Sequence, residues 1–393
     1  MMLKTIPISE AANRIGESQT LAIDAKAKAL KSKGLDIIGF AAGEPDFDTP
    51  EFIKEAAVKA LKEGKTKYTP SSGLVELREA ICEKLWKDNQ LKYDPKEVIV
   101  SCGAKHTIFN IIVSTCNPGD QVLIPAPFWV SYPEMVNFVG AEATIIPTGS
   151  SLKVTTNLLD QYAKSNAKLL IINSPSNPTG VVYTRKELEA IANWCLQKNI
   201  WIISDEIYEK LWFANEPFSS IANISDEVKQ ITFVVNGLSK AYSMTGWRIG
   251  YVACNKEITD AMGRLQSQST SNPTSISQYA SIAALRGDQN VVVEMCKAYK
   301  RRRDLALDLL KKIPGTNCVV PGGAFYLFPS IQNGKINSFK FCEDLLIKAN
   351  VAAVPGLAFG QEGYIRISYA TSDENIKKGI ERIAQFISEN YQS

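Results

Sequence analysis

Residues 167–208 read AKLLIINSPSNPTGVVYTRKELEAIANWCLQKNIWIISDEIY and decide the fold class. Two apolar runs, Leu169–Asn173 and Ile200–Ser204, flank an amphipathic stretch at Arg185–Lys198. Because both runs are apolar at nearly every position, they predict strands that are covered on both faces. A strand, a helix and a second strand in this order are typical of a parallel sheet with crossover helices.

The same alternation extends in both directions along the chain. Further strands are predicted at Val98–Ser101, Gln121–Pro125, Ala143–Ile146, Thr232–Val235 and Gly250–Cys254. Helical patterns lie at Lys105–Thr115 and Lys256–Gln266. The sequence therefore predicts an α/β fold with a mostly parallel seven-stranded sheet covered by helices.

The two ends of the chain follow a different pattern. Residues 18–33 form a helical pattern followed by a short apolar run, and long helices are mixed with short apolar runs after residue 291. A chain of 393 residues is long enough for two domains. We predict a large domain over residues 49–290 and a smaller α+β domain over residues 291–393, which residues 1–48 help to build.

Composition and charge exclude several classes of protein. The net charge of +3 indicates neither a nucleic-acid patch nor a membrane-surface helix, and no apolar run is long enough to span a membrane. The eight cysteines form no C-x-x-C pair, so we expect free thiols and no metal site. The N-terminus has no signal-peptide pattern, which favours a cytoplasmic location.

Residues with chemical potential follow five of the predicted strands. Ligands bind beyond the carboxyl ends of the strands in an open α/β sheet, so these residues would meet in one crevice. They are an anion nest at Gly103-Ala104, the ring of Trp129, the amide of Asn177, Asp205 with Tyr208, and Lys240 with Arg248. Each alone has a simpler structural explanation, such as a helix cap or a core ring. Together they predict a site for a planar, phosphorylated, nitrogen-containing ring with an aldehyde.

At these residues the chain resembles a known family. The segment SKAYSMTGWRIG at 239–250 is similar to the cofactor-lysine signature of the fold-type I pyridoxal-phosphate aminotransferases. The blocks NSPSNPTG at 173–180, SDEIY at 204–208, GEPDF at 43–47 and RISY at 366–369 also resemble family blocks. The resemblance is strongest to the bacterial aspartate aminotransferases of class I, and it runs from about residue 18 to the C-terminus.

The resemblance implies roles for the residues around the ring of pyridoxal 5'-phosphate. Lys240 would hold the cofactor as a Schiff base and then move a proton at the substrate α-carbon. Asp205 would keep the pyridine nitrogen protonated. Tyr208 and Asn177 would form hydrogen bonds with the ring oxygen, and Trp129 would stack on the ring.

The resemblance also implies a phosphate site that is shared between two subunits. The backbone at Gly103, Ala104 and Lys105 would bind the phosphate together with the Arg248 side chain. Position 237 is glycine where many relatives have a phosphate-binding serine, so Ser239 would replace that contact. Tyr68 would come from the partner subunit, which implies a homodimer.

The substrate residues implied by the resemblance recognise two carboxylates. Arg366 would bind the α-carboxylate beside the backbone of Gly43, with Trp129 and Asn177 also in contact. The distal carboxylate would be bound by Lys105 together with Ser18 and Thr20. This set predicts exchange of amino groups between aspartate, glutamate and their 2-oxo acids.

Other functions remain open to different degrees. Some relatives that accept prephenate carry a lysine near Gly16-Glu17, and this chain has none there. An aspartate/prephenate, aromatic or kynurenine aminotransferase, or a lyase on the same scaffold, stays an alternative. A nucleotide-binding dehydrogenase is disfavoured, because no G-x-G-x-x-G follows a strand and position 59 is Lys where a P-loop ending at Gly64-Lys65-Thr66 needs Gly. A transcriptional regulator would need a basic DNA-binding module ahead of the fold.

Overall fold

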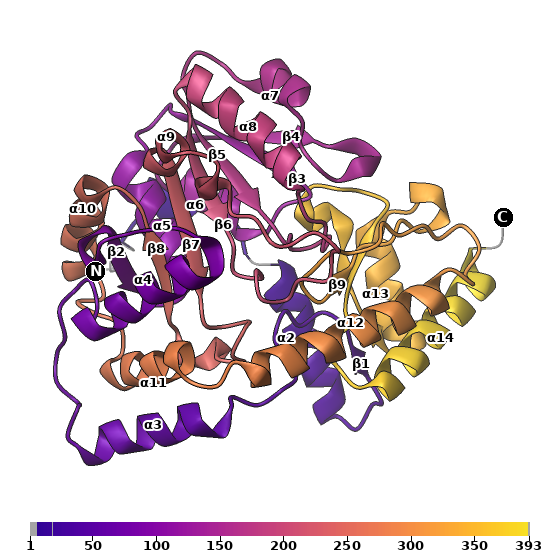
Figure 1. Ribbon diagram of the computed structural model, residues 1–393. Coiled ribbons are helices and arrows are strands. Elements are labelled where there is room, and N and C mark those ends of the chain that lie inside the picture. Colours follow the sequence, from indigo (N-terminus) through magenta and orange to yellow (C-terminus); the bar gives the residue numbers. More distant parts are fainter. Residues whose placement is uncertain (1–5, 18, 392–393) are drawn as a thin grey trace, which may run out of the picture.

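The computed structural model describes residues 6–17 and 19–391, and these residues form three sheets. The largest sheet has seven strands in the order β2-β8-β7-β6-β5-β3-β4 (Figure 1). Strand β8 runs antiparallel to both of its neighbours, and the other pairings in this sheet are parallel. The predicted mostly parallel seven-stranded sheet is confirmed.

The strands of this sheet lie within two residues of the predicted bounds. They are β2 (Val98–Ser101), β3 (Gln121–Ala126), β4 (Glu142–Pro147), β5 (Ala167–Asn173), β6 (Trp201–Asp205), β7 (Thr232–Gly237) and β8 (Gly250–Ala253). Strand β4 lies at the edge of the sheet, and its two end residues are exposed. An edge position therefore explains why this strand is less buried than an apolar run suggests.

Helices connect and cover the strands. They are α1 (Glu10–Asn13), α2 (Gln19–Ser32), α3 (Glu51–Lys62), α4 (Val75–Asn89), α5 (Ala104–Thr115), α6 (Ser131–Phe138), α7 (Thr156–Tyr162), α8 (Arg185–Lys198), α9 (Asp226–Gln230), α10 (Lys256–Ser267), α11 (Ser275–Arg286), α12 (Asn290–Leu310), α13 (Ser338–Ala349) and α14 (Asp373–Asn390). The predicted helix at 185–198 has the observed bounds, and it begins with a capping box between Thr184 and Glu187.

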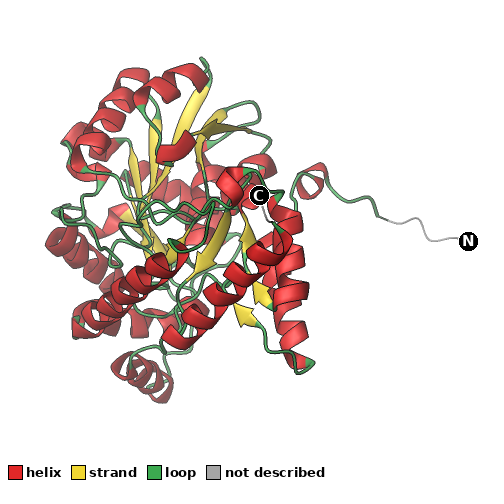
Figure 2. Cartoon of the chain, turned by 90° about the vertical axis from the view of Figure 1, so that its right-hand side faces the viewer, coloured by secondary structure: helices red, strands yellow, loops and turns green. Residues whose placement is uncertain are grey.

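The central strands are buried on both faces, as their apolar runs predict. In β5, Leu169 and Ile171 pack into a core with α5, α6 and α10. Leu170 and Ile172 point to the opposite face and pack into a second core with α8. The strands thus lie inside a shell of helices (Figure 2). Two-sided packing fixes the register of the sheet and hence the positions of the residues at the strand ends.

One small sheet joins the two ends of the chain, and the other is built from the C-terminal region alone. Strand β1 (Ile38–Gly39) pairs in parallel with β10 (Val351–Ala352). Strands β11 (Val354–Pro355), β12 (Ile365–Ser368) and β9 (Tyr326–Leu327) form an antiparallel sheet. Helix α2 also packs against β10 and β11, so N-terminal and C-terminal elements lie side by side (Figure 1).

Candidate functional site

A cavity of about 450 Å³ lies beyond the carboxyl ends of β5, β6 and β7. Its walls come from the seven-stranded sheet and from the small sheets, so residues far apart in sequence meet there. It brings together most of the residues expected from the sequence: Thr20, Gly43, Ala104, Lys105, Trp129, Asn177, Asp205, Tyr208, Ser239, Lys240, Arg248 and Arg366.

Lys240 lies in the loop after β7, and its amine points into the cavity. Its Nζ donates a hydrogen bond to the carbonyl oxygen of Gly43 at 2.5 Å. Burial lowers the pKa of this amine to about 8, and Glu44 partly opposes the shift. A larger fraction of Lys240 is therefore neutral near pH 7 than for an exposed lysine, which suits it to nucleophilic and proton-transfer chemistry.

Asp205 is the last residue of β6 and is only 4% exposed. The hydroxyl of Tyr132 donates to its Oδ2 at 2.6 Å, and the backbone N–H of Ile207 donates to its Oδ1 at 3.2 Å. Burial raises the pKa of Asp205 to about 6, while these two hydrogen bonds act in the opposite direction. The carboxyl group is thus held in a fixed orientation, with a pKa closer to neutral pH than that of an exposed aspartate.

Two tyrosines form the next part of the wall. The hydroxyl groups of Tyr208 and Tyr326 lie 2.7 Å apart, and burial raises the pKa of both phenols. A side chain at Gly43 would bring its Cβ within 2.8 Å of the Tyr326 hydroxyl. Glycine at position 43 therefore lets the backbone approach both Tyr326 and the amine of Lys240.

Arg366, in β12, carries a guanidinium that is enclosed by the protein and only 2% exposed. It donates to Asn177 Oδ1 at 2.9 Å and to the carbonyl oxygen of Ala41 at 2.6 Å, and it lies 4.5 Å from the centroid of the Tyr326 ring. Burial lowers its pKa. Its Nε has no hydrogen-bond partner among the described residues, so the group retains capacity for an anion.

The N-terminus of α5 forms an anion site with Arg248. Gly103 has φ of 90° and precedes the helix, so the first backbone N–H groups of α5 are available to a ligand. A Cβ at Gly103 would lie 2.4 Å from Arg248 Nη2, and one at Gly250 would lie 2.1 Å from the backbone nitrogen of Ala104. Arg248 donates to the carbonyl oxygens of Thr245 and Cys102. Both glycines are therefore required for this close approach.

A second group of residues lines the side of the cavity nearer the N-terminal segment. Lys105 Nζ lies 4.9 Å from the centroid of the Trp129 ring, and burial together with Arg248 lowers the pKa of this lysine. Thr20 contributes to the same cavity from α2. A cationic and a hydroxyl side chain thus lie on the wall where the distal carboxylate of the substrate is expected.

Two predicted residues of the described part of the chain lie outside the cavity lining. Gly103 shapes the anion site from behind Arg248 without lining the cavity. Tyr68 is 90% exposed on the surface of the single chain, and Ser18 lies outside the described residues. A side chain at Gly237 would place its Cβ 2.9 Å from the carbonyl oxygen of Ile249. This close contact gives a physical reason for glycine at position 237.

Two tyrosines of the site are not predicted from the sequence. Tyr132 binds Asp205, and its position three residues after Trp129 is the signal that could have revealed it, because the rings form an edge-to-face pair with centroids 5.4 Å apart. Tyr326 lies in a short apolar run of the C-terminal region, and nothing in the local sequence distinguishes it from a core residue.

The expected exclusions concern metal sites and membrane-spanning helices. Over residues 6–17 and 19–391, no group of three or more His, Cys, Asp or Glu side chains could hold a metal ion. No helix in the described part of the chain is both long and apolar enough to cross a membrane. The eight cysteines are free.

Comparisons with known proteins agree with the site. The family model described as "Aminotransferase class I and II" matches residues 35–383. A probable aspartate/prephenate aminotransferase of Aquifex aeolicus is 51% identical over 95% of this chain and 96% of its own length. An aspartate aminotransferase of Bacillus sp. strain YM-2 is also 51% identical, over 94% of this chain and 96% of its own length.

Solved structures give the same result. An aspartate aminotransferase from Thermus thermophilus with maleate has a TM-score of 0.93 and 41% identity, and the match covers 97% of this chain and all of that one. The aspartate aminotransferase from Rhizobium meliloti also gives a TM-score of 0.93, at 40% identity over 97% of this chain and 98% of that one. Common descent with these enzymes therefore explains why an amine, a carboxylate and a buried guanidinium surround one cavity. This chain belongs to the aminotransferase class I and II family.

Proposed function

We propose that this chain is an aspartate aminotransferase that uses pyridoxal 5'-phosphate. It would transfer the amino group of L-aspartate to 2-oxoglutarate, giving oxaloacetate and L-glutamate. The observation that carries the proposal is that Lys240, Asp205 and Arg366 face one cavity from three different elements. An enclosed amine, an enclosed carboxylate and an enclosed guanidinium suit transfer of an amino group between carboxylic acids.

The residues of the cavity fit the proposed cofactor. A phosphate needs a cationic side chain and exposed backbone N–H groups, and Arg248 and the N-terminus of α5 supply them. Ala104 and Lys105 would contribute the amides, and Ser239 a hydroxyl. The absence of a Cβ at Gly103 leaves the room that Arg248 occupies.

Lys240 would be the residue that transfers the proton. Bound pyridoxal phosphate supplies an aldehyde that bonds to amines and a ring that accepts the electron pair left when the substrate α-carbon loses a proton. The lowered pKa of Lys240 would let its amine take up that proton near neutral pH and donate it again later in the cycle. Gly43 accepts a hydrogen bond from this amine and so orients it.

The other residues near the ring would set its electronic state. Asp205 would hold a proton at the ring nitrogen, and Tyr132 keeps the carboxylate oriented for this role. Tyr208 and Asn177 would form hydrogen bonds with the ring oxygen. Trp129 would stack on the ring face.

Substrate recognition would use both ends of a dicarboxylic acid. Arg366 would bind the α-carboxylate beside Gly43, because it is buried and its Nε has no partner among the described residues. Asn177 accepts a hydrogen bond from Arg366, so the same amide would link substrate binding to the ring. Lys105, with Ser18 and Thr20, would bind the distal carboxylate.

We also propose a cytoplasmic homodimer. Tyr68 is 90% exposed in the single chain, so its ring is accessible to a second copy. In that dimer Tyr68 of the partner subunit would complete the phosphate site. The eight free cysteines are in keeping with a reducing compartment.

The test is a spectroscopic and chemical cycle on the purified protein. Adding L-aspartate should remove the absorption band of the bound cofactor, and adding 2-oxoglutarate should restore it, with oxaloacetate and glutamate as products. Borohydride reduction followed by peptide mass analysis should place the cofactor on Lys240. A label on a different residue, or a band that L-aspartate leaves unchanged, would reject the proposal.

One alternative is supported by a particular observation. The 51% identical relative from Aquifex aeolicus is named for both aspartate and prephenate. Prephenate would need room beside the distal-carboxylate site, and a second cavity of about 480 Å³ adjoins Lys105. Comparing kcat/KM for prephenate and 2-oxoglutarate as amino acceptors separates a bifunctional enzyme from one that is specific for dicarboxylic acids.

A further inference from the structure

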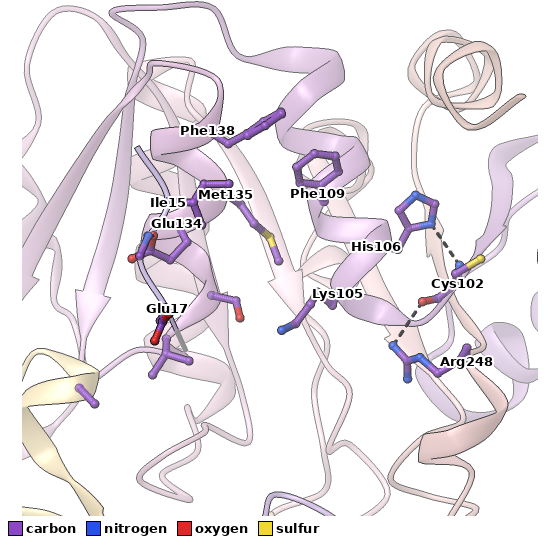
Figure 3. A pocket seen from close by; sticks show the side chains of 14 residues that line it. Ile15, Glu17, Cys102, Lys105, His106, Phe109, Glu134, Met135, Phe138 and Arg248 are labelled. Atoms are coloured by element: carbon purple, nitrogen blue, oxygen red, sulfur yellow. Dashed lines mark hydrogen bonds between the residues drawn. The ribbon is translucent and has the colours of Figure 1, made fainter. Parts of the chain in front are cut away.

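A second cavity adjoins the first and is closed on one side by the N-terminal segment. It has a volume of about 480 Å³ and shares Lys105 and Arg248 with the first cavity. Figure 3 shows Ile15 and Glu17 on the same side as Glu134 of α6, facing Lys105 of α5 across the space. Residues 15–17 therefore lie against α6, close to the expected site of the distal carboxylate.

Three hydrogen bonds hold the N-terminal segment on α6. Arg14 donates from Nε to the carbonyl oxygen of Asn137 at 2.8 Å and from Nη2 to that of Phe138 at 3.0 Å. These carbonyls belong to the last two residues of α6, where the helix dipole favours a cation, and the Asn137 carbonyl also accepts from the backbone N–H groups of Val139 and Gly140. The backbone N–H of Gly16 donates to Glu134 Oε2 at 2.7 Å, which is a charge-assisted bond.

The same helix reaches the chemical centre at its other end. Tyr132, in the first turn of α6, donates to Asp205, and Trp129 just before the helix lines the first cavity. The chain also continues from Gly16 to Thr20 of α2, which lines that cavity. Four residues span at most about 14 Å, so the position of Gly16 limits the position of Thr20.

We propose that Arg14 and Glu134 are positioning residues that set the affinity for the distal carboxylate of the substrate. This inference rests on the proposed function of the site. A segment fixed in advance on α6 needs no further ordering when the substrate binds, whereas a loose segment has to be ordered at the expense of binding free energy. Neither residue reaches Lys240, so the proton transfer itself is left unchanged.

The kinetic test compares variants of the cofactor-loaded enzyme. We expect Arg14→Ala to raise the KM for aspartate and the Kd for maleate about tenfold, with kcat within about twofold of the wild type. Arg14→Lys restores part of the affinity, because one amine can still reach a helix carbonyl. Glu134→Ala weakens binding, whereas Glu134→Gln retains an acceptor for the Gly16 N–H and stays near the wild type. Lys26→Ala is the matched control, since Lys26 is an exposed cation of α2 that pairs with Glu343.

A second measurement is independent of turnover. Hydrogen exchange of peptides covering residues 9–17, in the holoenzyme without substrate, should accelerate in Arg14→Ala and Glu134→Ala but not in Glu134→Gln or Lys26→Ala. Unchanged exchange in the two alanine variants would overturn the attachment to α6. Faster exchange with unchanged KM and Kd would overturn its role in affinity. If the wild type neither turned over aspartate nor bound maleate while exchange followed the pattern, the proposed function would fail and the attachment would stand.

Discussion

The two walls of the cavity are built in different ways. The sheet wall, defined as Asp205, Tyr208 and Lys240, follows the strand ends of the seven-stranded sheet, where strand pairing fixes the backbone. The cap wall, defined as Gly43 and Arg366, comes from segments associated with the small sheets. Gly43 accepts a hydrogen bond from Lys240 of the sheet wall, and Arg366 donates one to Asn177. The sheet wall carries the proposed proton chemistry, and the cap wall carries the proposed recognition of the substrate. Changes in the sheet wall should therefore lower kcat, and changes in the cap wall should mainly raise KM.

The largest expected effect is in the sheet wall, at Lys240. We expect Lys240→Ala to lower kcat by about 10⁴-fold or more, because both the covalent attachment and the proton carrier are lost. Turnover of aspartate by the purified variant measures this. Far-ultraviolet circular dichroism and the melting temperature should match those of wild-type apoprotein. A kcat within about tenfold of the wild type would place the chemistry on a different residue.

The cap wall has its largest expected effect at Arg366. Arg366→Gln should lower kcat/KM for aspartate by about 10²- to 10³-fold, mainly through KM, because a charge-assisted contact with the α-carboxylate is lost. Arg366→Lys keeps the charge without the planar fork, so its kcat/KM should lie between those of the wild type and Arg366→Gln. Initial rates over a range of aspartate concentrations separate KM from kcat. A loss confined to kcat would contradict the division between the walls.

The walls also differ in how far the sequence predicts them. Asp205 and Lys240 follow apolar runs whose two-sided burial identifies strands, so a local pattern places them at the sheet edge. Arg366 was identified through family resemblance, because an arginine in a short apolar run has no local signal of its own. The contact of Tyr326 with Tyr208 and Gly43 joins segments that are distant in sequence. Such a contact depends on how the small sheets pack, which residue spacing does not encode.

A smaller change acts on the sheet wall through Tyr132, which donates a hydrogen bond to Asp205. Its hydrogen bond lowers the pKa of Asp205. Burial acts in the opposite direction and outweighs this bond, so the pKa is raised to about 6. Tyr132→Phe removes that bond, so the pKa of Asp205 should rise further and less carboxylate should be present near neutral pH. We expect kcat to fall about tenfold and its acidic limb to move to higher pH. A lower kcat with an unmoved pH profile would mean that Tyr132 acts only through packing.

The pH dependence of cofactor capture tests Lys240 without catalysis. Its pKa is lowered to about 8 by burial, and only the neutral amine attacks an aldehyde. The rate at which apoprotein captures pyridoxal phosphate should rise about tenfold per pH unit below pH 8 and level off above it. Stopped-flow absorbance measures the rate. If the capture rate levelled off only near the ordinary lysine pKa of about 10.4, the cavity would not perturb the pKa of the amine.

The smallest expected effect lies directly behind the sheet wall, at Glu206. This carboxyl group is buried and accepts hydrogen bonds from Ser204 and Ser220, and burial together with Glu209 raises its pKa to about 7 from an ordinary value of 4.5. Between those two pH values the folded protein holds a proton that the unfolded chain has released. The free energy of unfolding should therefore fall as pH rises through this window, by about 1 kcal/mol per unit.

Replacing Glu206 tests whether this buried group shapes stability without touching the chemistry. Glu206→Gln cannot titrate, so its free energy of unfolding should depend less on pH between 4.5 and about 7 than that of the wild type. The Asp205 contribution is present in both proteins and cancels in the comparison. Urea unfolding of the holoenzyme at several pH values gives the slopes, with the exposed Glu216→Gln as control. Equal slopes in wild type and Glu206→Gln would show that the group titrates normally in the fold. A kcat reduced more than about tenfold in Glu206→Gln would instead show that Glu206 contributes to the chemistry of the sheet wall.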